Sequence, residues 1–265
     1  MKLAFLAALA LTSCLSLAGP RGPGALVIVG GGGTPDSVVE TLFANSGGRA
    51  GRMVIFAQAS SRPEAGEESV AYWKGKGFGN VVSLDLTDVA AAREAIASAT
   101  LIWFPGGDQT RLLEAIEKAG LADAIRARHR AGAVVGGTSA GAAVLSPWMI
   151  VGGETADLTV VRSGTVAMAK GLGLLPGTII DQHFLKRQRF NRLLSAVLDH
   201  PDHVGIGIDE KTAIYVRGAH FDVLGESGVL VIDARGMEKD RAAQAARLTF
   251  LREGTGYELP TASGD

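Results

Sequence analysis

The sequence predicts an α/β fold, a three-layer sandwich in which a mostly parallel central sheet is flanked by helices. Two observations lead to this prediction. Short apolar runs rich in valine, isoleucine and leucine alternate with longer segments whose apolar residues recur at helical spacing. The connections between them are short and often contain glycine, as expected when strands and helices follow one another along a parallel sheet.

The first strand is expected at residues 25–29, a continuous apolar run typical of a strand covered on both faces. Four glycines, 30–33, follow it. They do not match the dinucleotide-binding pattern G-x-G-x-x-G, because Asp36 stands where the last glycine would be. We interpret them as a tight turn into a helix that begins near Asp36 and ends before Gly47.

The same alternation continues along the chain. Further strands are expected at 53–57, 81–86, 101–104, 178–180 and 204–208, with another at the start of the stretch 132–143. Helices are expected at 64–74, 88–97, 109–118, 121–131 and 186–198. A C-terminal β-meander is expected to extend or flank the sheet, with strands at 213–216, 220–224 and 228–232. The tail from Ala234 is polar and rich in alanine, so we expect it to be partly helical, with the last few residues disordered.

Length and composition favour one substantial core. The chain has 265 residues, of which 20% are charged, and a formal net charge of −1. We therefore expect a single α/β domain over 19–265. The near-neutral charge gives no reason to expect nucleic acid or an anionic membrane surface as a partner. Beyond the N-terminus there is no apolar run long enough for a transmembrane helix.

Residues 1–18 have the pattern of a secretory signal peptide. Lys2 precedes an apolar run over 3–11, and Ser16-Leu17-Ala18 fits a cleavage site. The only cysteine, Cys14, follows Leu-Thr-Ser and resembles the lipidated cysteine of a bacterial lipobox. Cleavage after Ala18, which would discard Cys14, is the alternative. Either interpretation predicts an exported protein, located in the periplasm, outside the cell or on the outer membrane as a lipoprotein.

A candidate nucleophile lies in the stretch 137–141, Gly-Thr-Ser-Ala-Gly, which matches the G-x-S-x-G pattern. The pattern is typical of a sharp turn between a strand and a helix that exposes a serine at its tip, and such a turn needs small neighbours. In a chain with 36 glycines a chance match is the alternative. The chemical interpretation of Ser139 therefore requires a base, an orienting acid and an oxyanion site elsewhere.

Candidates for the oxyanion site follow the strand 101–104. Gly106 and Gly107 let backbone N–H groups face a ligand, so the N–H groups of Gly107, Asp108 and Ala140 are candidate oxyanion donors. For the side chain of Asp108, capping of the following helix is the alternative role.

Candidates for the base and the acid also follow strands. His183 comes directly after an apolar strand and is surrounded by polar residues. Glu210, with Asp209, ends a buried strand, where an acid needs a partner such as an imidazole. The order serine, histidine, acid differs from that of α/β-hydrolases. His200 and His203 lack a third ligand nearby, so neither a metal nor a cofactor is expected.

Three arginines follow His183, and we interpret them as a clamp for substrate carboxylates. Arg189 and Arg192 share a helix face, and Arg187 lies just before them. A solvated basic face is the alternative interpretation of this run.

Four segments together resemble the family of serine peptidases that comprises the cyanophycinases and the aspartyl dipeptidases. They are Phe-Pro-Gly-Gly-Asp-Gln (104–109), Gly-Thr-Ser-Ala-Gly-Ala (137–142), Asp-Gln-His-Phe with the arginine run (181–192) and Gly-Ile-Gly-Ile-Asp-Glu-Lys-Thr-Ala (205–213). The resemblance implies a fold like that of class I glutamine amidotransferases, with serine in place of their cysteine. It also implies Ser139 as nucleophile, His183 as base and Glu210 as the acid that orients it. The substrate-binding residues it implies are Asp108, Gln109, Asp181, Gln182, Arg187, Arg189 and Arg192.

The same resemblance implies a peptide substrate and a homodimer. Members specific for cyanophycin hydrolyse this polymer, a poly-aspartate with arginine on each β-carboxyl, to β-Asp-Arg dipeptides. One departure concerns the guanidinium side of the pocket. Cyanobacterial members carry acidic residues after the first glycine turn, whereas residues 32–36 here are Gly-Gly-Thr-Pro-Asp. The alternatives are a peptidase acting on short aspartyl or isoaspartyl peptides and a non-catalytic binding domain, although the three filled catalytic positions speak against the latter.

Overall fold

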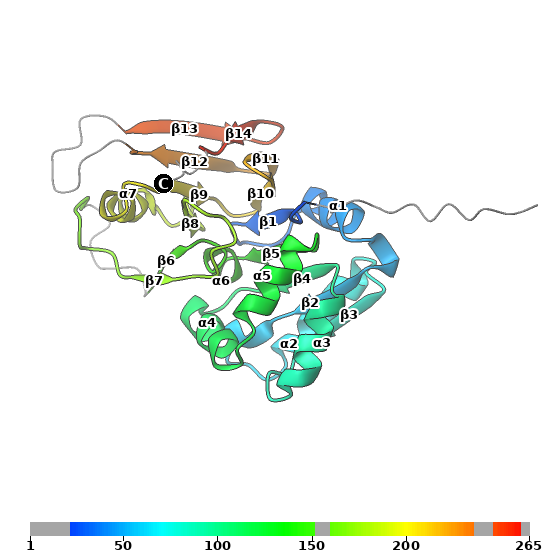
Figure 1. Ribbon diagram of the computed structural model, residues 1–265. Coiled ribbons are helices and arrows are strands. Elements are labelled where there is room, and N and C mark those ends of the chain that lie inside the picture. Colours follow the sequence, from blue (N-terminus) through cyan, green and yellow to red (C-terminus); the bar gives the residue numbers. More distant parts are fainter. Residues whose placement is uncertain (1–21, 152–159, 236–245, 261–265) are drawn as a thin grey trace, which may run out of the picture.

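A computed structural model describes residues 22–151, 160–235 and 246–260, and their strands form two sheets (Figure 1). The first sheet has the strand order β14-β11-β10-β1-β5-β4-β2-β3. Its strands are β1 (Leu26–Val29), β2 (Arg52–Ile55), β3 (Asn80–Ser83), β4 (Leu101–Phe104), β5 (Val134–Thr138), β10 (Thr212–Arg217), β11 (His220–Gly225) and β14 (Gly256–Glu258). The five strands from β1 to β3 in this order run parallel, and β10, β11 and β14 are antiparallel to their neighbours.

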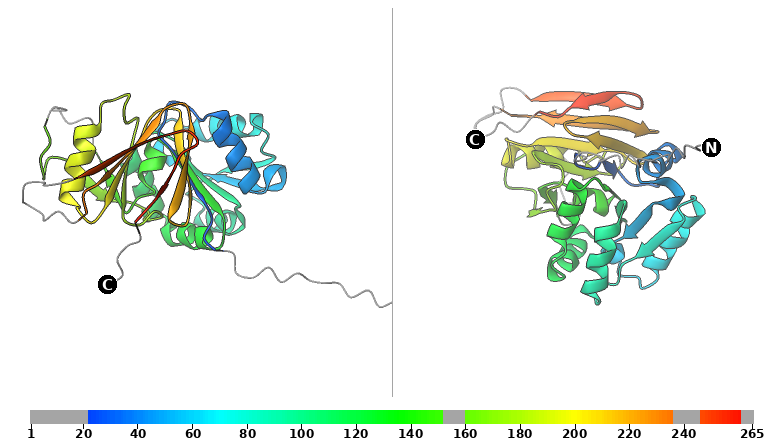
Figure 2. Two further views of the ribbon diagram at one scale, coloured as in Figure 1. Left: turned by 90° about the horizontal axis from the view of Figure 1, so that it is seen from above. Right: turned by 45° about the vertical axis from the view of Figure 1, so that its right-hand side comes forward.

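The second sheet has the strand order β13-β12-β9-β8-β6-β7. It consists of β6 (Trp148–Ile150), β7 (Met168–Lys170), β8 (Thr178–Gln182), β9 (Val204–Ile208), β12 (Gly228–Asp233) and β13 (Arg247–Arg252). Strands β6, β8 and β9 are parallel, and β7, β12 and β13 are each antiparallel to the strands they pair with. The meander strands β11 to β14 lie at the opposite side of the molecule from helices α2 to α5, as both Figure 1 and Figure 2 show.

Helices cover both faces of the parallel strands, so the fold class predicted from the sequence is confirmed. The helices are α1 (Asp36–Asn45), α2 (Ala65–Gly75), α3 (Val89–Ser98), α4 (Gln109–Lys118), α5 (Ala122–Arg130), α6 (Ala140–Ala143) and α7 (Phe190–Asp199), with short 3-10 turns at Gly48–Ala50 and Ala57–Ala59. In β1, Val27 and Val29 pack with α1 and α2, whereas Leu26 and Ile28 pack with α3 to α5. All four side chains are buried, which explains why the strand is a continuous apolar run.

The division into two sheets differs from the single central sheet expected from the sequence. Strands β8 and β9 belong to the second sheet, and the chain returns to the first sheet between Ile208 and Thr212. The two sheets meet at the carboxyl end of β1, where the N–H of His183 donates to the carbonyl of Gly30 over 2.7 Å. Strand order is a tertiary property that apolar runs do not encode. The junction is also where the candidate site lies.

The C-terminal tail contains a strand that was not predicted from the sequence. Residues 247–252 form β13, in which Thr249 and Leu251 alternate with Leu248 and Phe250 and which pairs along β12. Leu251 is buried in the main core. The predicted signal peptide with Cys14, the stretch 236–245 and the last five residues lie outside the described part of the chain. Among the helices of the described part, none is long and apolar enough to span a membrane.

Candidate active site

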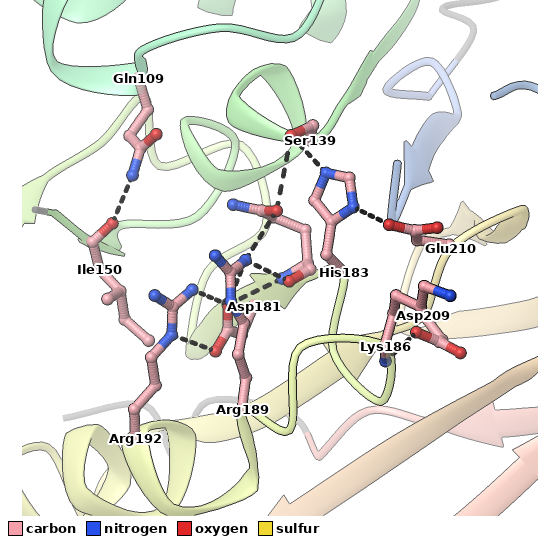
Figure 3. Close-up of polar contacts among 11 residues, drawn as sticks. Gln109, Ser139, Ile150, Asp181, His183, Lys186, Arg189, Arg192, Asp209 and Glu210 are labelled. Atoms are coloured by element: carbon pink, nitrogen blue, oxygen red, sulfur yellow. Dashed lines mark hydrogen bonds and ion pairs between the residues drawn. The ribbon is translucent and has the colours of Figure 1, made fainter. Parts of the chain in front are cut away.

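Ser139 stands at a sharp turn between β5 and α6. Its backbone has φ 55° and ψ −116°, a strained conformation for a residue with a side chain. The flanking glycines are required sterically. A Cβ atom at Gly141 would lie 1.9 Å from the carbonyl oxygen of Phe104, and one at Gly137 would lie 2.3 Å from that of Gly141. The G-x-S-x-G pattern therefore forms the expected elbow, with the serine side chain at its tip (Figure 3).

The structure brings Ser139, His183 and Glu210 together, although each follows a different strand (Figure 3). The Oγ atom of Ser139 lies 2.9 Å from Nε2 of His183, and Nδ1 of His183 lies 2.7 Å from Oε1 of Glu210. A carboxylate can only accept, so this contact places a proton on Nδ1 and leaves Nε2 to accept from the serine hydroxyl. His183 is 8% exposed and has a positive φ of 48°.

A cavity of about 1220 Å³ opens beside Ser139. Its lining contains four basic residues and one acidic residue, and is formed by Gly107, Asp108, Gln109, Thr110, Ser139, Gln182, Lys186, Arg187, Arg189 and Arg192. Six of the seven predicted substrate-binding residues are in this lining. A cavity with this excess of positive charge favours ligands that carry carboxylates.

The seventh, Asp181, lies beneath the cavity and does not line it. Both of its oxygens are used inside the protein: Oδ2 accepts from Nε of Arg192 over 2.8 Å, and Oδ1 accepts from a terminal nitrogen of Arg192 and from the N–H of Gln182. Asp181 is 1% exposed and Arg192 is 8% exposed. The expectation that Asp181 contacts substrate is therefore wrong for this structure, because a buried carboxylate takes the nearest cation as its partner.

The two glutamines of the cavity each make contacts within the protein. Gln109 donates through Nε2 to the carbonyl of Ile150 over 2.8 Å. Gln182 accepts through Oε1 from Arg189 over 3.0 Å, and the same oxygen lies 3.5 Å from Oγ of Ser139. Arg189 also donates to the carbonyl of Gln182 over 2.6 Å. These contacts hold both glutamine side chains in place at the cavity.

Asp108 caps α4, as one of the two interpretations predicted. Its Oδ1 atom accepts from the N–H groups of Thr110 and Arg111 over 2.8 and 3.1 Å. The residue is nevertheless exposed and lines the cavity. Capping uses only one carboxylate oxygen, so the role in the cavity is compatible with the cap.

One of the three predicted oxyanion donors is already hydrogen-bonded within the protein. The N–H of Asp108 donates to the carbonyl of Ala59 over 2.9 Å, so it is engaged in the protein and this part of the prediction is wrong. Within the described residues, the N–H groups of Gly107 and Ala140 make no backbone hydrogen bond. These two remain candidates for stabilising an oxyanion next to Ser139.

Two features of the site were not assigned from the sequence. Gly31 and Gly32, interpreted there as parts of a turn, lie against the side chains of His183 and Glu210. Asp209 does not pair with an imidazole: it accepts from the N–H of Lys186 over 2.9 Å and from Oγ of Ser227 over 2.7 Å. The residues next to Asp209 in the sequence do not indicate that Lys186 and Ser227 are its partners. In the part of the chain that is described, no three His, Cys, Asp or Glu side chains gather as a metal site would require.

A strained serine in contact with a histidine, which in turn contacts a glutamate, on an α/β fold, defines the class of the serine hydrolases. The sequence profile described as Peptidase family S51 matches residues 46–224. The chain belongs to this family and is a serine-type peptidase.

Relatives agree with this assignment, and solved structures share the fold. A cyanophycinase from Geminocystis herdmanii is 34% identical over 253 residues, which span 87% of this chain and 92% of the relative. A cyanophycinase from Trichormus variabilis is 37% identical over 215 residues, which span 76% of this chain and 72% of the relative.

A peptidase from an acI-B1 Actinobacterium has a similar fold, with a TM-score of 0.65 and 22% identity over 91% of this chain and 98% of that one. A putative peptidase E protein from Listeria monocytogenes has a TM-score of 0.55 and 19% identity over 78% and 100% of the two chains.

Proposed function

We propose that this peptidase is an exopeptidase that hydrolyses cyanophycin and releases β-Asp-Arg dipeptides. The observation that carries the proposal is the cavity beside Ser139, whose lining contains Lys186 and three arginines. A poly-aspartate chain presents free carboxylates, which such a lining would attract. The similarity to proteins named cyanophycinase over most of their length supports the same substrate.

In the proposed mechanism, Oγ of Ser139 attacks the carbonyl carbon of the scissile amide while Nε2 of His183 accepts the serine proton. The N–H groups of Gly107 and Ala140 stabilise the oxyanion of the tetrahedral intermediate. When the intermediate collapses, the C–N bond breaks and the imidazolium gives its proton to the departing amine. Water then attacks the acyl-enzyme in the same manner, which releases the acid product and restores the Ser139 hydroxyl. Glu210 stabilises the imidazolium in both steps.

Substrate recognition is proposed to divide between cations and one acid. Arg187, Arg189 and Arg192 bind the aspartate carboxylates. Asp181 occupies Nε and one terminal nitrogen of Arg192, which leaves the second terminal nitrogen for a ligand. Asp108 is the acidic residue among those that line the cavity in the described part, and its Oδ2 would accept from the substrate guanidinium. This assignment supplies an acid for the substrate guanidinium although residues 32–36, after the first glycine turn, differ from those of cyanobacterial members.

We also propose that the protein is exported. Support comes from the sequence over 1–18, in which a positive start precedes an apolar run and a small-residue cleavage site. An exported enzyme of this kind would suit the use of polymer released by other cells. Lipidation at Cys14 and cleavage after Ala18 are distinguished by the mass of the mature N-terminal peptide.

The test is incubation of the purified mature protein with insoluble cyanophycin, followed by mass spectrometry of the soluble products. We expect β-Asp-Arg from the parent protein and a loss of about three orders of magnitude or more in Ser139→Ala. Ser163→Ala serves as the control, because Ser163 is exposed and bonded to Asp199 at the end of α7. Cleavage of short aspartyl or isoaspartyl peptides, without release of dipeptides from cyanophycin, would show that short peptides are the substrate and the polymer is not. Inactivity on both, with no labelling of Ser139 by a fluorophosphonate, would leave a non-catalytic binding domain.

A further inference from the structure

Three consecutive carbonyl groups at the end of β1 hold the three loops of the candidate triad. The carbonyl of Val29 accepts from the N–H of Ser139 over 3.0 Å. The carbonyl of Gly30 accepts from the N–H of His183 over 2.7 Å, and that of Gly31 accepts from the N–H of Lys211, the residue after Glu210, over 2.7 Å. One short segment therefore fixes the backbone of all three loops relative to one another.

The same segment also lies against the side chains. A Cβ atom at Gly31 would lie 2.4 Å from both Cε1 and Nε2 of His183, far inside normal contact distance. A Cβ atom at Gly32 would lie 2.6 Å from Cβ and 2.9 Å from Oε2 of Glu210. Gly33 differs, because a Cβ atom there would meet nothing within 4 Å. Any side chain at position 31 would thus push the imidazole of His183 away.

We propose that Gly31 is a positioning residue of the peptidase, an inference that rests on the proposed role of His183. Its lack of a side chain allows the imidazole to lie 2.9 Å from Ser139 and 2.7 Å from Glu210 at the same time. Ordinary van der Waals contact begins at about 3.4 Å, so a methyl group 2.4 Å from the imidazole displaces the ring by about 1 Å. Displacements of that order cost about 100-fold in the rate of a reaction that depends on near-attack geometry.

Gly31→Ala and Gly33→Ala form a matched pair. The two glycines have φ of 103° and 109°, so alanine is strained to a similar degree at both positions. Only the methyl group at position 31 meets the imidazole. We expect Gly31→Ala to lower the rate of fluorophosphonate labelling of Ser139 about 100-fold, and Gly33→Ala to leave it within about threefold of the parent, since strain alone leaves the ring in place. On a substrate, the loss should lie in kcat and not in KM.

A proton resonance adds a readout that does not depend on turnover. The Nδ1 proton shared between His183 and Glu210 should give a low-field NMR signal in the parent and in Gly33→Ala. In Gly31→Ala this signal should be lost or shifted. Assignment of the signal comes from its disappearance in His183→Ala.

A second comparison separates the ring contact from backbone strain and stays informative when Gly31→Ala folds poorly. In a His183→Ala background the imidazole is absent, so the methyl group at position 31 has room. We expect Gly31→Ala to lower the thermal unfolding midpoint strongly in the parent and much less in His183→Ala. Gly33→Ala should lower it equally in both backgrounds.

Each outcome decides the proposal. Equal losses of labelling in Gly31→Ala and Gly33→Ala, or a midpoint shift at position 31 that is the same with and without His183, would overturn it. A parent protein that is labelled but does not hydrolyse cyanophycin would refute the proposed substrate and leave the role of Gly31 standing. A parent protein that shows neither labelling nor the resonance would refute both.

Discussion

The guanidinium of Arg192 is held from inside the protein by the carboxylate of Asp181, which accepts from its Nε and from one terminal nitrogen. Both side chains are almost completely buried. Arg192 also lines the cavity beside Ser139, so this pair fixes a cation in the cavity wall (Figure 3). A pre-oriented guanidinium loses less conformational entropy on binding a carboxylate than a mobile one would.

Asp181→Asn should destabilise the protein strongly, because it leaves the charge of Arg192 buried without its counter-ion. Removal of one partner of a buried pair costs about 3–5 kcal/mol, measured here as the free energy of unfolding in urea. Asp123→Asn is the matched control. Its carboxylate pairs with Arg126 but is 92% exposed, so its loss should leave the free energy of unfolding close to that of the parent. Similar costs for the two variants would show that burial of the Asp181 pair carries no energetic weight.

Asp108→Asn should separate the two roles assigned to this residue. Asparagine caps helices about as well as aspartate, so the unfolding midpoint should stay close to that of the parent. Loss of the charge removes the proposed partner of the substrate guanidinium, and hydrogen bonds to charged groups contribute about 1.5–3 kcal/mol. KM for a short oligomer of β-Asp-Arg units should therefore rise about tenfold or more. An otherwise equal oligomer with citrulline in place of arginine should bind the two proteins alike. An unchanged KM for the arginine substrate would remove Asp108 from recognition.

The strands that the sequence predicts best are those buried on both faces. Leu101–Phe104 and Val204–Ile208 have the expected bounds, because an uninterrupted apolar run bounded by polar residues and glycine leaves few alternatives. The elbow around Ser139 is likewise local, since five adjacent residues determine its shape. That Ser139, His183 and Glu210 approach one another follows from their position after strands whose carboxyl ends meet.

Features that depend on distant partners could not be predicted. Asp181 and Arg192 are eleven positions apart, and the sequence does not tell whether each faces a ligand or the other. The N–H of Asp108 donates to the carbonyl of Ala59, which is distant in the sequence, and so it does not face an oxyanion. Strand β13 was missed because only Leu251 of its apolar side chains is buried, so its alternation gives a weak signal. In each case tertiary packing decides between two locally reasonable structures.

His129 lies in the last turn of α5, ten positions before Ser139 in the sequence. It borders a separate cavity of about 330 Å³ that Leu26, Leu174 and Val216 also line. It is 8% exposed, and its Nε2 atom has no hydrogen-bond partner among the described residues. Burial therefore lowers the pKa of the His129 imidazole below its ordinary value of 6.5, and the charge of Arg130 lowers the pKa further.

This shift predicts that His129 makes the folded state less stable as the pH falls from 7 towards 5. As the pH falls below 6.5, the unfolded chain binds a proton at His129 before the folded chain does. Protonation therefore favours unfolding until the pH has passed the lowered pKa of the folded state.

His220 acts with the opposite sign, because hydrogen bonds to Asp222 and Glu258 raise its pKa. Its stabilising effect is present below pH 6.5 and is lost as the pH rises through the raised pKa. We therefore expect His129→Leu to flatten the dependence of the unfolding free energy on pH between 5 and 7, and His220→Asn to steepen its fall towards low pH. Urea unfolding at intervals of half a pH unit measures both slopes. A slope in His129→Leu equal to that of the parent would mean that His129 is solvated or protonated in the folded protein, contrary to its burial.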